Sequence, residues 1–232
     1  MRITAETAEL MERAQRPLPK TNISTRISSR RALSVGIIGG GVGGVAAGVA
    51  LHRAGIEVTI YERAEAFREV GAGMMLWPNA TRVLKALGLL EKVAALSGAS
   101  DHFLVRASCG KILIDISLGR FDVPALCARR ADLLDALISV LPAANVRLNH
   151  YFDFFEYRKR GVAVHFTGAA SAEHDVVIGA DGIRSRVRSQ LLGLHEPIYR
   201  GYMVWRGLAH LPGTVSCGCN SETWGVESGS ES

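Results

Sequence analysis

A six-residue glycine run, GGGVGG at residues 39–44, constrains the fold more than any other feature of the sequence. Residues 33–38 before it are apolar and β-branched, residues 45–54 after it are small, and residues 56–61 form a second apolar run. Such apolar runs are typical of buried parallel strands, and strand, helix and strand within about 30 residues make a βαβ unit. The sequence therefore predicts an α/β fold with a Rossmann-like parallel sheet.

The glycines fit the spacing G-x-G-x-x-G through Gly39, Gly41 and Gly44, with Gly43 as a further position without a side chain. In such loops the first glycine permits the tight turn, the second lets the backbone approach a pyrophosphate, and the third lets helix and strand pack closely. The helix N-terminus supplies free N–H groups for phosphates. A glycine-rich turn alone is weak evidence, but the strand before it and the helix after it predict a dinucleotide site.

An acidic residue stands where the second strand ends, about 20 residues after the loop. Glu62 at this position favours a free ribose 2′-hydroxyl, as in FAD or NAD, over the 2′-phosphate of NADP. The neighbouring Arg63 weakens that preference slightly. The alternative interpretation of Glu62 is a solvated carboxylate at a strand end.

Further along the chain, the pattern predicts a helix from Pro78 to about residue 87, with Ala80, Val83, Leu84 and Leu87 on one face. Residues 102–107 and 111–116 flank a Cys-Gly pair and predict an antiparallel hairpin, inserted at 102–116. Residues 132–141 predict another amphipathic helix, and residues 162–166 and 175–178 predict late strands.

The net charge of +5 is concentrated at the front of the chain, where four of the five charges lie before Leu33. This distribution predicts a flexible basic extension over residues 1–32 and gives a nucleic-acid surface little support. No apolar run is long enough to predict a transmembrane segment. Cys109, Cys127, Cys217 and Cys219 lack the spacing of a metal site or a disulfide framework, so we expect reduced thiols, no metal and a cytoplasmic protein.

Three further segments resemble the class A (single-component) flavoprotein monooxygenases, the aromatic-ring hydroxylases that include salicylate and urate hydroxylases. Residues 71–80 (GAGMMLWPNA) are similar to the segment that passes near the flavin ring. Residues 129–133 (RRADL) are similar to the R-x-D-L pattern, and residues 175–188 (DVVIGADGIRSRVR) to the second fingerprint, the DG motif. With the glycine loop, these segments stand in the order that the family shows.

The resemblance implies a glutathione-reductase-like FAD domain at residues 33–195, followed at 196–232 by the start of a mixed or antiparallel substrate-domain sheet. It implies FAD contacts from the residues near the ring, from the arginine of R-x-D-L, and from the DG motif, which bears on FAD and on the pyridine nucleotide. These residues are Gly71, Ala72, Gly73, Met75, Arg130, Asp181, Gly182 and Arg184. A cation that opens a helix, such as Arg130, opposes the macrodipole and so favours an anionic partner.

The implied activity is a monooxygenase reaction in which NADH or NADPH reduces FAD and one atom of dioxygen enters a small aromatic or heteroaromatic ring. The cofactor carries that chemistry, so the sequence need not supply a nucleophile or a general base. Arg206, in a Trp-Arg-Gly segment, is a weak candidate for contact with an anionic substrate, and a surface arginine explains it equally well. The sequence leaves the oligomeric state open.

The family's third fingerprint, a GD motif with a nearby His and Pro, is missing from the sequence. The resemblance therefore covers the N-terminal part of the family and predicts a truncated form. Two alternatives stay open: a catalytically inactive FAD-binding fragment, and a flavin-dependent reductase or dehydrogenase of the same fold.

Overall fold

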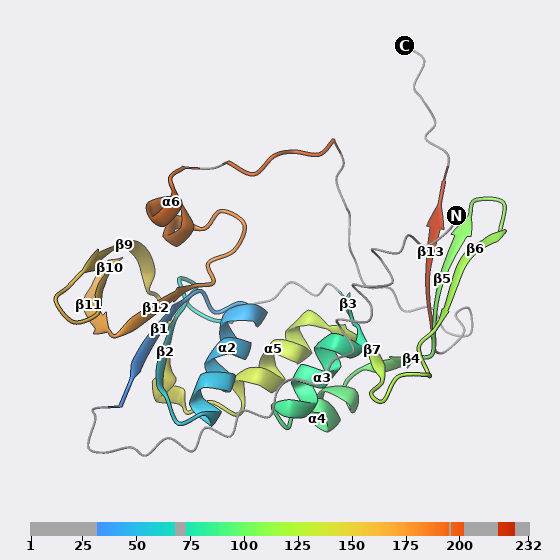
Figure 1. Cartoon of the computed structure of the whole chain (residues 1–232), viewed down its shortest axis with the longest axis horizontal. Coiled ribbons are helices and arrows are strands. Elements are labelled where there is room, and N and C mark those ends of the chain that lie inside the picture. The colour runs from blue at the N-terminus through green and yellow to red at the C-terminus, as the bar shows by residue number, and fades with distance from the viewer. Residues whose placement is uncertain (1–31, 68–72, 195, 202–217, 226–232) are drawn as a thin grey trace, which may run out of the picture. The chain divides into compact units, whose positions relative to one another are not determined.

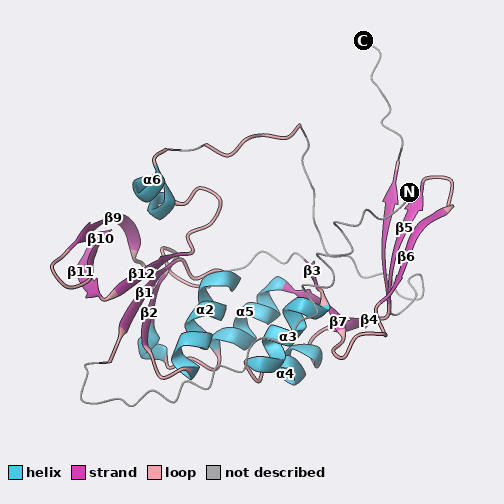
Figure 2. Cartoon of the chain, viewed as in Figure 1, coloured by secondary structure: helices cyan, strands magenta, loops and turns pink. Residues whose placement is uncertain are grey.

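The computed structural model describes residues 32–67, 73–194, 196–201 and 218–225 (Figure 1). The basic extension predicted over residues 1–32 lies almost wholly outside the described residues, as do Gly71, Ala72 and Arg206. The secondary structure of the described part is drawn in Figure 2.

A four-stranded parallel sheet stands at the centre of the predicted dinucleotide domain, in the order β12-β1-β2-β8. Its strands are β1 (Ser34–Ile38), β2 (Glu57–Tyr61), β8 (Val146–Arg147) and β12 (Val176–Gly179). Helix α2 (Val42–Arg53) connects β1 to β2 and packs against the sheet (Figure 1). Small residues allow this contact, since a Cβ on Gly48 would lie 2.6 Å from Cδ1 of Ile60. The predicted βαβ unit is confirmed.

Three more helices share one apolar core with this unit: α3 (Pro78–Ala86), α4 (Leu90–Ala94) and α5 (Arg130–Ile138). A short 3-10 turn, η1 (Ala143–Asn145), follows α5. The fully buried side chains of this core include Ile37, Val45, Ile60, Leu126 and Leu137.

The predicted apolar face of α3 is partly wrong, because Val83 is 47% exposed while Leu84 and Leu87 are buried. The buried stripe runs instead through Pro78, Thr81, Leu84 and Leu87, at intervals of three residues. Thr81 is fully buried because its hydroxyl donates to the carbonyl of Pro78, at 3.3 Å, which removes the cost of burying it. The buried face of α3 therefore contains Thr81, whereas the sequence pattern predicted Val83 there.

Three small sheets complete the described chain. An antiparallel sheet has the order β11-β10-β9, with β9 (Tyr151–Tyr157), β10 (Val162–Thr167) and β11 (Ala169–His174). A second has the order β3-β7-β4, with β3 (Gly73–Leu76), β7 (Ala125–Arg129) and β4 (Gly98–Ser100). The third has the order β13-β5-β6, with β13 (Cys219–Trp224), β5 (His102–Ala107) and β6 (Ile112–Ser117). Helix α6 (Arg186–Leu192) follows β12.

The predicted hairpin at 102–116 is confirmed as the antiparallel pair β5 and β6. It does not stand alone, because β13 pairs with β5 in parallel and makes the sheet mixed. An α/β chain with one parallel sheet and further antiparallel and mixed sheets is the fold class that the sequence predicts. The domain boundaries at 33–195 and 196–232 stay predictions.

A second core lies where the parallel sheet meets the antiparallel sheet of β9–β11, and it contains a buried polar chain. Nδ1 of His174 is 2.8 Å from the hydroxyl of Ser34, and its Nε2 is 2.8 Å from the hydroxyl of Tyr61. A neutral imidazole can donate through one nitrogen and accept through the other, so both contacts are satisfied without a charge. Gly36 makes room for the ring, since a Cβ there would lie 2.6 Å from its Cδ2.

Burial lowers the pKa of His174 below its ordinary value of 6.5, although the charges of Glu57 and Asp175 oppose this shift. Burial likewise raises the pKa of the Tyr61 phenol. Below about pH 6.5 the unfolded chain therefore binds a proton at His174 that the folded chain does not bind. The free energy of unfolding must fall as the pH is lowered from this value toward the pKa of the folded state.

We predict that His174→Gln, which keeps hydrogen-bonding groups but cannot titrate, flattens this pH dependence. Urea unfolding at about pH 7 and about pH 5 measures it, and the unaltered chain should lose more stability than the variant between the two pH values. Equal losses in the two proteins would contradict the assignment of a neutral, buried His174.

Candidate cofactor site

The carboxyl ends of three strands meet at one edge of the parallel sheet. Ile38 at the end of β1 is in register with Tyr61 of β2 and with Gly179 of β12. The chain continues the pairing beyond the strands, because the Gly39 N–H donates to the Tyr61 carbonyl at 2.8 Å. In open α/β sheets such an edge, where neighbouring strands lead away in opposite directions, is where ligands bind.

Two of the predicted loop glycines are required by the close packing of the chain on itself. Gly39 has φ +109°, and a Cβ there would lie 2.4 Å from the carbonyl oxygen of Ala180. A Cβ on Gly44 would lie 2.0 Å from the carbonyl oxygen of Gly39. Both distances are far below van der Waals contact, so any other residue would force helix α2 and the strands apart. These geometries match the tight turn and the close helix–strand packing expected of the two glycines.

The other two glycines face open space instead. Gly41, the N-cap of α2, has an extended backbone that any residue adopts, and a Cβ there would approach only Nη2 of Arg130, at 3.9 Å. A Cβ on Gly43 would meet nothing within 4 Å. Among the described residues no side chain caps α2, and its first turn contains no acidic residue. The first N–H groups of the helix and its positive end are therefore uncapped by side chains, which suits the binding of an anion.

Glu62 connects the end of β2 to this loop through one of its carboxylate oxygens and holds its own turn through the other. Oε2 accepts from the Gly40 N–H at 2.6 Å, and Oε1 accepts from the Ala64 N–H at 2.9 Å. The side chain is half-buried, whereas Arg63 beside it is exposed. Each carboxylate oxygen can accept more than one hydrogen bond, so the expected contact with ribose hydroxyls is compatible with these two bonds.

Arg130 reaches the loop from a distant part of the sequence. It is the first residue of α5, which packs beside α2, and its guanidinium approaches the open side of Gly41. Its neighbour Arg129 pairs with Asp132 at 2.9 Å. The structure thus brings together Gly41, Glu62 and Arg130, three residues that the sequence predicts in one cofactor site.

Gly73 and Met75 lie on β3, the strand that pairs with β7 just before Arg130. Gly73 is exposed, and a Cβ there would meet nothing within 4 Å, so its backbone is open to a ligand. Met75 is half-buried and receives a hydrogen bond from the amide of Asn220 on β13. Sequence reasoning missed Asn220, because no local pattern indicates that β13 would reach β3.

Asp181 makes its contacts within its own turn. Its Oδ1 accepts from the Ser185 hydroxyl at 2.5 Å, and its Oδ2 accepts from the N–H groups of Arg186 and Val187 at 2.6 and 3.2 Å. Gly182 allows the turn with φ +89°. Asp181 therefore fixes the start of α6, while the side chain of Arg184 is exposed. A contact of these residues with a cofactor stays a prediction.

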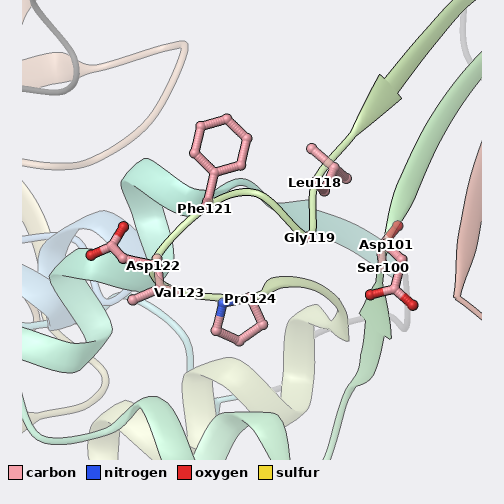
Figure 3. A pocket seen from close by; sticks show the side chains of 8 residues that line it. All are labelled: Ser100, Asp101, Leu118, Gly119, Phe121, Asp122, Val123 and Pro124. Carbon is pink, nitrogen blue, oxygen red and sulfur yellow. The ribbon is translucent and has the colours of Figure 1, made fainter.

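A pocket of about 270 Å³ lies elsewhere, between the end of β4 and the segment from Leu118 to Pro124 (Figure 3). Asp122 on its rim pairs with Arg82, and that hydrogen bond lowers the pKa of the Asp122 carboxyl. None of the predicted site residues lines this pocket. Over the described ranges, no helix is long and apolar enough to cross a membrane, and no cluster of His, Cys, Asp and Glu side chains is placed to hold a metal ion.

Residues 32–204 match the protein family described as FAD binding domain. Two curated relatives are the 3-amino-4-hydroxybenzoate 2-monooxygenase of Streptomyces platensis, 37% identical over 79% of this chain, and the 6-hydroxynicotinate 3-monooxygenase of Pseudomonas fluorescens, 32% identical over 77%. The match covers 48% of each relative. The chain thus spans about half the length of the curated relatives that it matches.

Two solved structures are similar as well. Klebsiella pneumoniae HpxO in complex with FAD and uric acid is 27% identical, with a TM-score of 0.61 over 70% of this chain and 42% of that protein. The 2,6-dihydroxypyridine-3-hydroxylase of Arthrobacter nicotinovorans is 23% identical, with a TM-score of 0.62 over 75% of this chain and 42% of that protein. At that identity the second structure shows the fold alone.

We predict that Gly41→Val abolishes FAD binding and leaves the fold intact. The backbone at Gly41 is allowed for valine and its Cβ has room, so the fold tolerates the change while the side chain fills the space that a pyrophosphate would occupy. FAD titration followed by flavin fluorescence, with circular dichroism as the check on folding, measures both effects. Gly98→Val on β4 is a matched control, because its Cβ also meets nothing and it lies outside the loop. Normal FAD affinity in Gly41→Val would refute the loop as the phosphate site.

Proposed function

Because the chain belongs to the FAD binding domain family, together with FAD-dependent aromatic monooxygenases, we propose that it holds FAD for the NAD(P)H-dependent hydroxylation of a small aromatic or heteroaromatic ring. The observation that carries the proposal is the uncapped N-terminus of α2 at Gly41, with Glu62 directly after β2 and Arg130 close by. This combination suits a dinucleotide, since it offers N–H groups and a cation to phosphates and a carboxylate to a ribose.

The chemistry of the described residues fits FAD. The N–H groups of the first turn of α2 and the Arg130 guanidinium would bind the pyrophosphate, and Glu62 would accept from the ribose of the adenosine half. The open backbone of Gly73 would lie against the flavin ring, with Met75 beside it. Asp181 and Gly182 would hold the turn that closes the same sheet edge.

Bound FAD would supply the chemistry that the protein lacks: it would accept electrons from NADH or NADPH and use them to insert one atom of dioxygen into the ring. The residues of this chain would orient the cofactor and balance the negative charge of its phosphates. No side chain of the described residues is required as a nucleophile.

The substrate class comes from the relatives. The two curated enzymes are named for 3-amino-4-hydroxybenzoate and 6-hydroxynicotinate, both hydroxylated aromatic acids. We extend to this chain a substrate of that class, with dioxygen and NADH or NADPH as co-substrates. Because the chain spans about half of those relatives, turnover is a separate matter from FAD binding. A module that binds FAD without turnover, and a reductase of the same fold, are the competing functions.

We predict that the purified chain binds one equivalent of FAD and that a hydroxylated aromatic acid stimulates its oxidation of NADH or NADPH. The visible spectrum measures the first effect. Consumption of NADH and of NADPH, each with 3-amino-4-hydroxybenzoate and with 6-hydroxynicotinate, measures the second. Oxygen-18 gas should label the product ring.

The outcomes of this experiment separate the three functions. A chain that cannot be loaded with FAD would overturn the whole proposal. FAD binding with release of hydrogen peroxide and no labelled product would favour the module without turnover. Reduction of the organic substrate without incorporated oxygen would favour the reductase.

A further inference from the structure

The sheet of β3, β7 and β4 has one buried and one open face. Its strand β7 ends directly before Arg130, beside the cofactor loop. Leu76, Leu126 and Ala128 point into the core and are almost fully buried. Alternate residues of the same strands lie on the other face, where Gly73 pairs with Arg129 and Met75 pairs with Cys127. Three residues of strand, about 10 Å, separate Cys127 from Arg130 beside the loop.

Asn220 of β13 lies on this open face and contacts both of its sulfur-bearing side chains. Its amide nitrogen is 3.1 Å from Sδ of Met75 and 3.6 Å from Sγ of Cys127. A thioether sulfur can only accept, so the amide group must face Met75 with its nitrogen. That orientation turns the carbonyl oxygen, Oδ1, away from the sulfurs. No described group donates a hydrogen bond to Oδ1, and the residue is half-buried.

We propose that Asn220 is a specificity-determining residue, whose Oδ1 accepts a hydrogen bond from a hydroxyl or amino group on the aromatic substrate. This inference rests on the proposed function, because it assumes that the ring reacts over the open face of Gly73 and Met75. The chemistry of the face sets the preference. Oδ1 is an acceptor, and Glu222, two residues along β13, adds a carboxylate on the same side of the strand. A ring substituent that donates a hydrogen bond is favoured here over one that only accepts.

Such a site would reject a ring without a donor, because Oδ1 would then lose its contact with water and gain no partner. A matched pair of ligands tests this effect: 4-hydroxybenzoate and 4-methoxybenzoate carry the same charge, and in the second a methyl group replaces the donor hydrogen. The FAD-loaded chain should bind the hydroxyl compound about tenfold more tightly or better, measured as a change in the flavin absorbance. Asn220→Leu should reduce the ratio to about twofold or less at unchanged FAD affinity.

Two further variants guard against a purely structural effect. Asn220→Asp keeps an acceptor oxygen and should keep the preference for the hydroxyl compound. Ser221→Ala changes the opposite side of β13 and should leave both affinities as they are. An Asn220→Leu variant that folds, binds FAD and still discriminates by tenfold would overturn the proposal.

A second readout needs no flavin. Cys127 is an exposed free thiol in contact with Asn220, and Cys109, also exposed and free, lies in the turn between β5 and β6. Bound 4-hydroxybenzoate should slow alkylation of Cys127 by iodoacetamide at least threefold and leave Cys109 unchanged, with each peptide resolved by mass spectrometry. In Asn220→Leu the protection should disappear.

The two readouts distinguish failure of this inference from failure of the proposed function. If FAD binds but neither ligand protects Cys127 or perturbs the flavin, the role of Asn220 is wrong and FAD binding stands. If FAD does not bind while Cys127 is protected in an Asn220-dependent way, the proposed function fails and the recognition role of Asn220 stands.

Discussion

The contact between the start of α2 and the end of β1 is the constraint on which the rest of the site depends. The chain crosses itself so closely that a Cβ on Gly44 would lie 2.0 Å from the Gly39 carbonyl oxygen. Only glycine permits this crossing, and only the crossing places the N-terminus of α2 at the sheet edge where β1, β2 and β12 end together. Glu62 then fixes the loop from the side through the Gly40 N–H. A helix end without side-chain capping suits the binding of a phosphate when it is held this rigidly.

The features that the sequence predicts correctly are those encoded within a few residues. The glycine spacing, the apolar runs of β1 and β2 and the turn of the β5–β6 hairpin each carry a local signal, and each is present in the structure. The start of α5 at Arg130, two residues earlier than predicted, places the guanidinium beside Gly41. Thr81 illustrates the limit of such patterns, since a polar side chain becomes core when a nearby carbonyl accepts its hydrogen bond.

Contacts between distant segments could not be predicted in this way. The parallel pairing of β13 with β5 joins residues more than a hundred positions apart, and it alone brings Asn220 to Met75 and Cys127. The buried chain through His174 is likewise invisible locally, because its partners Ser34 and Tyr61 come from two other strands. No periodicity or residue spacing in the sequence indicates which strands pair across such separations. The roles of the individual site residues therefore stay proposals, and the structure names the contacts by which each can be tested.

Hydrogen exchange of the backbone amides, with and without FAD, tests the central claim most directly. The claim is that the first turn of α2 binds the cofactor's phosphates, so FAD should slow exchange at residues 41–45 and at the start of α5 near Arg130. Mass spectrometry of peptides from the full chain resolves these segments from the pocket at Leu118–Pro124, which should exchange at the same rate in both states. Binding of FAD that protects the pocket segment and leaves residues 41–45 unchanged would contradict the account.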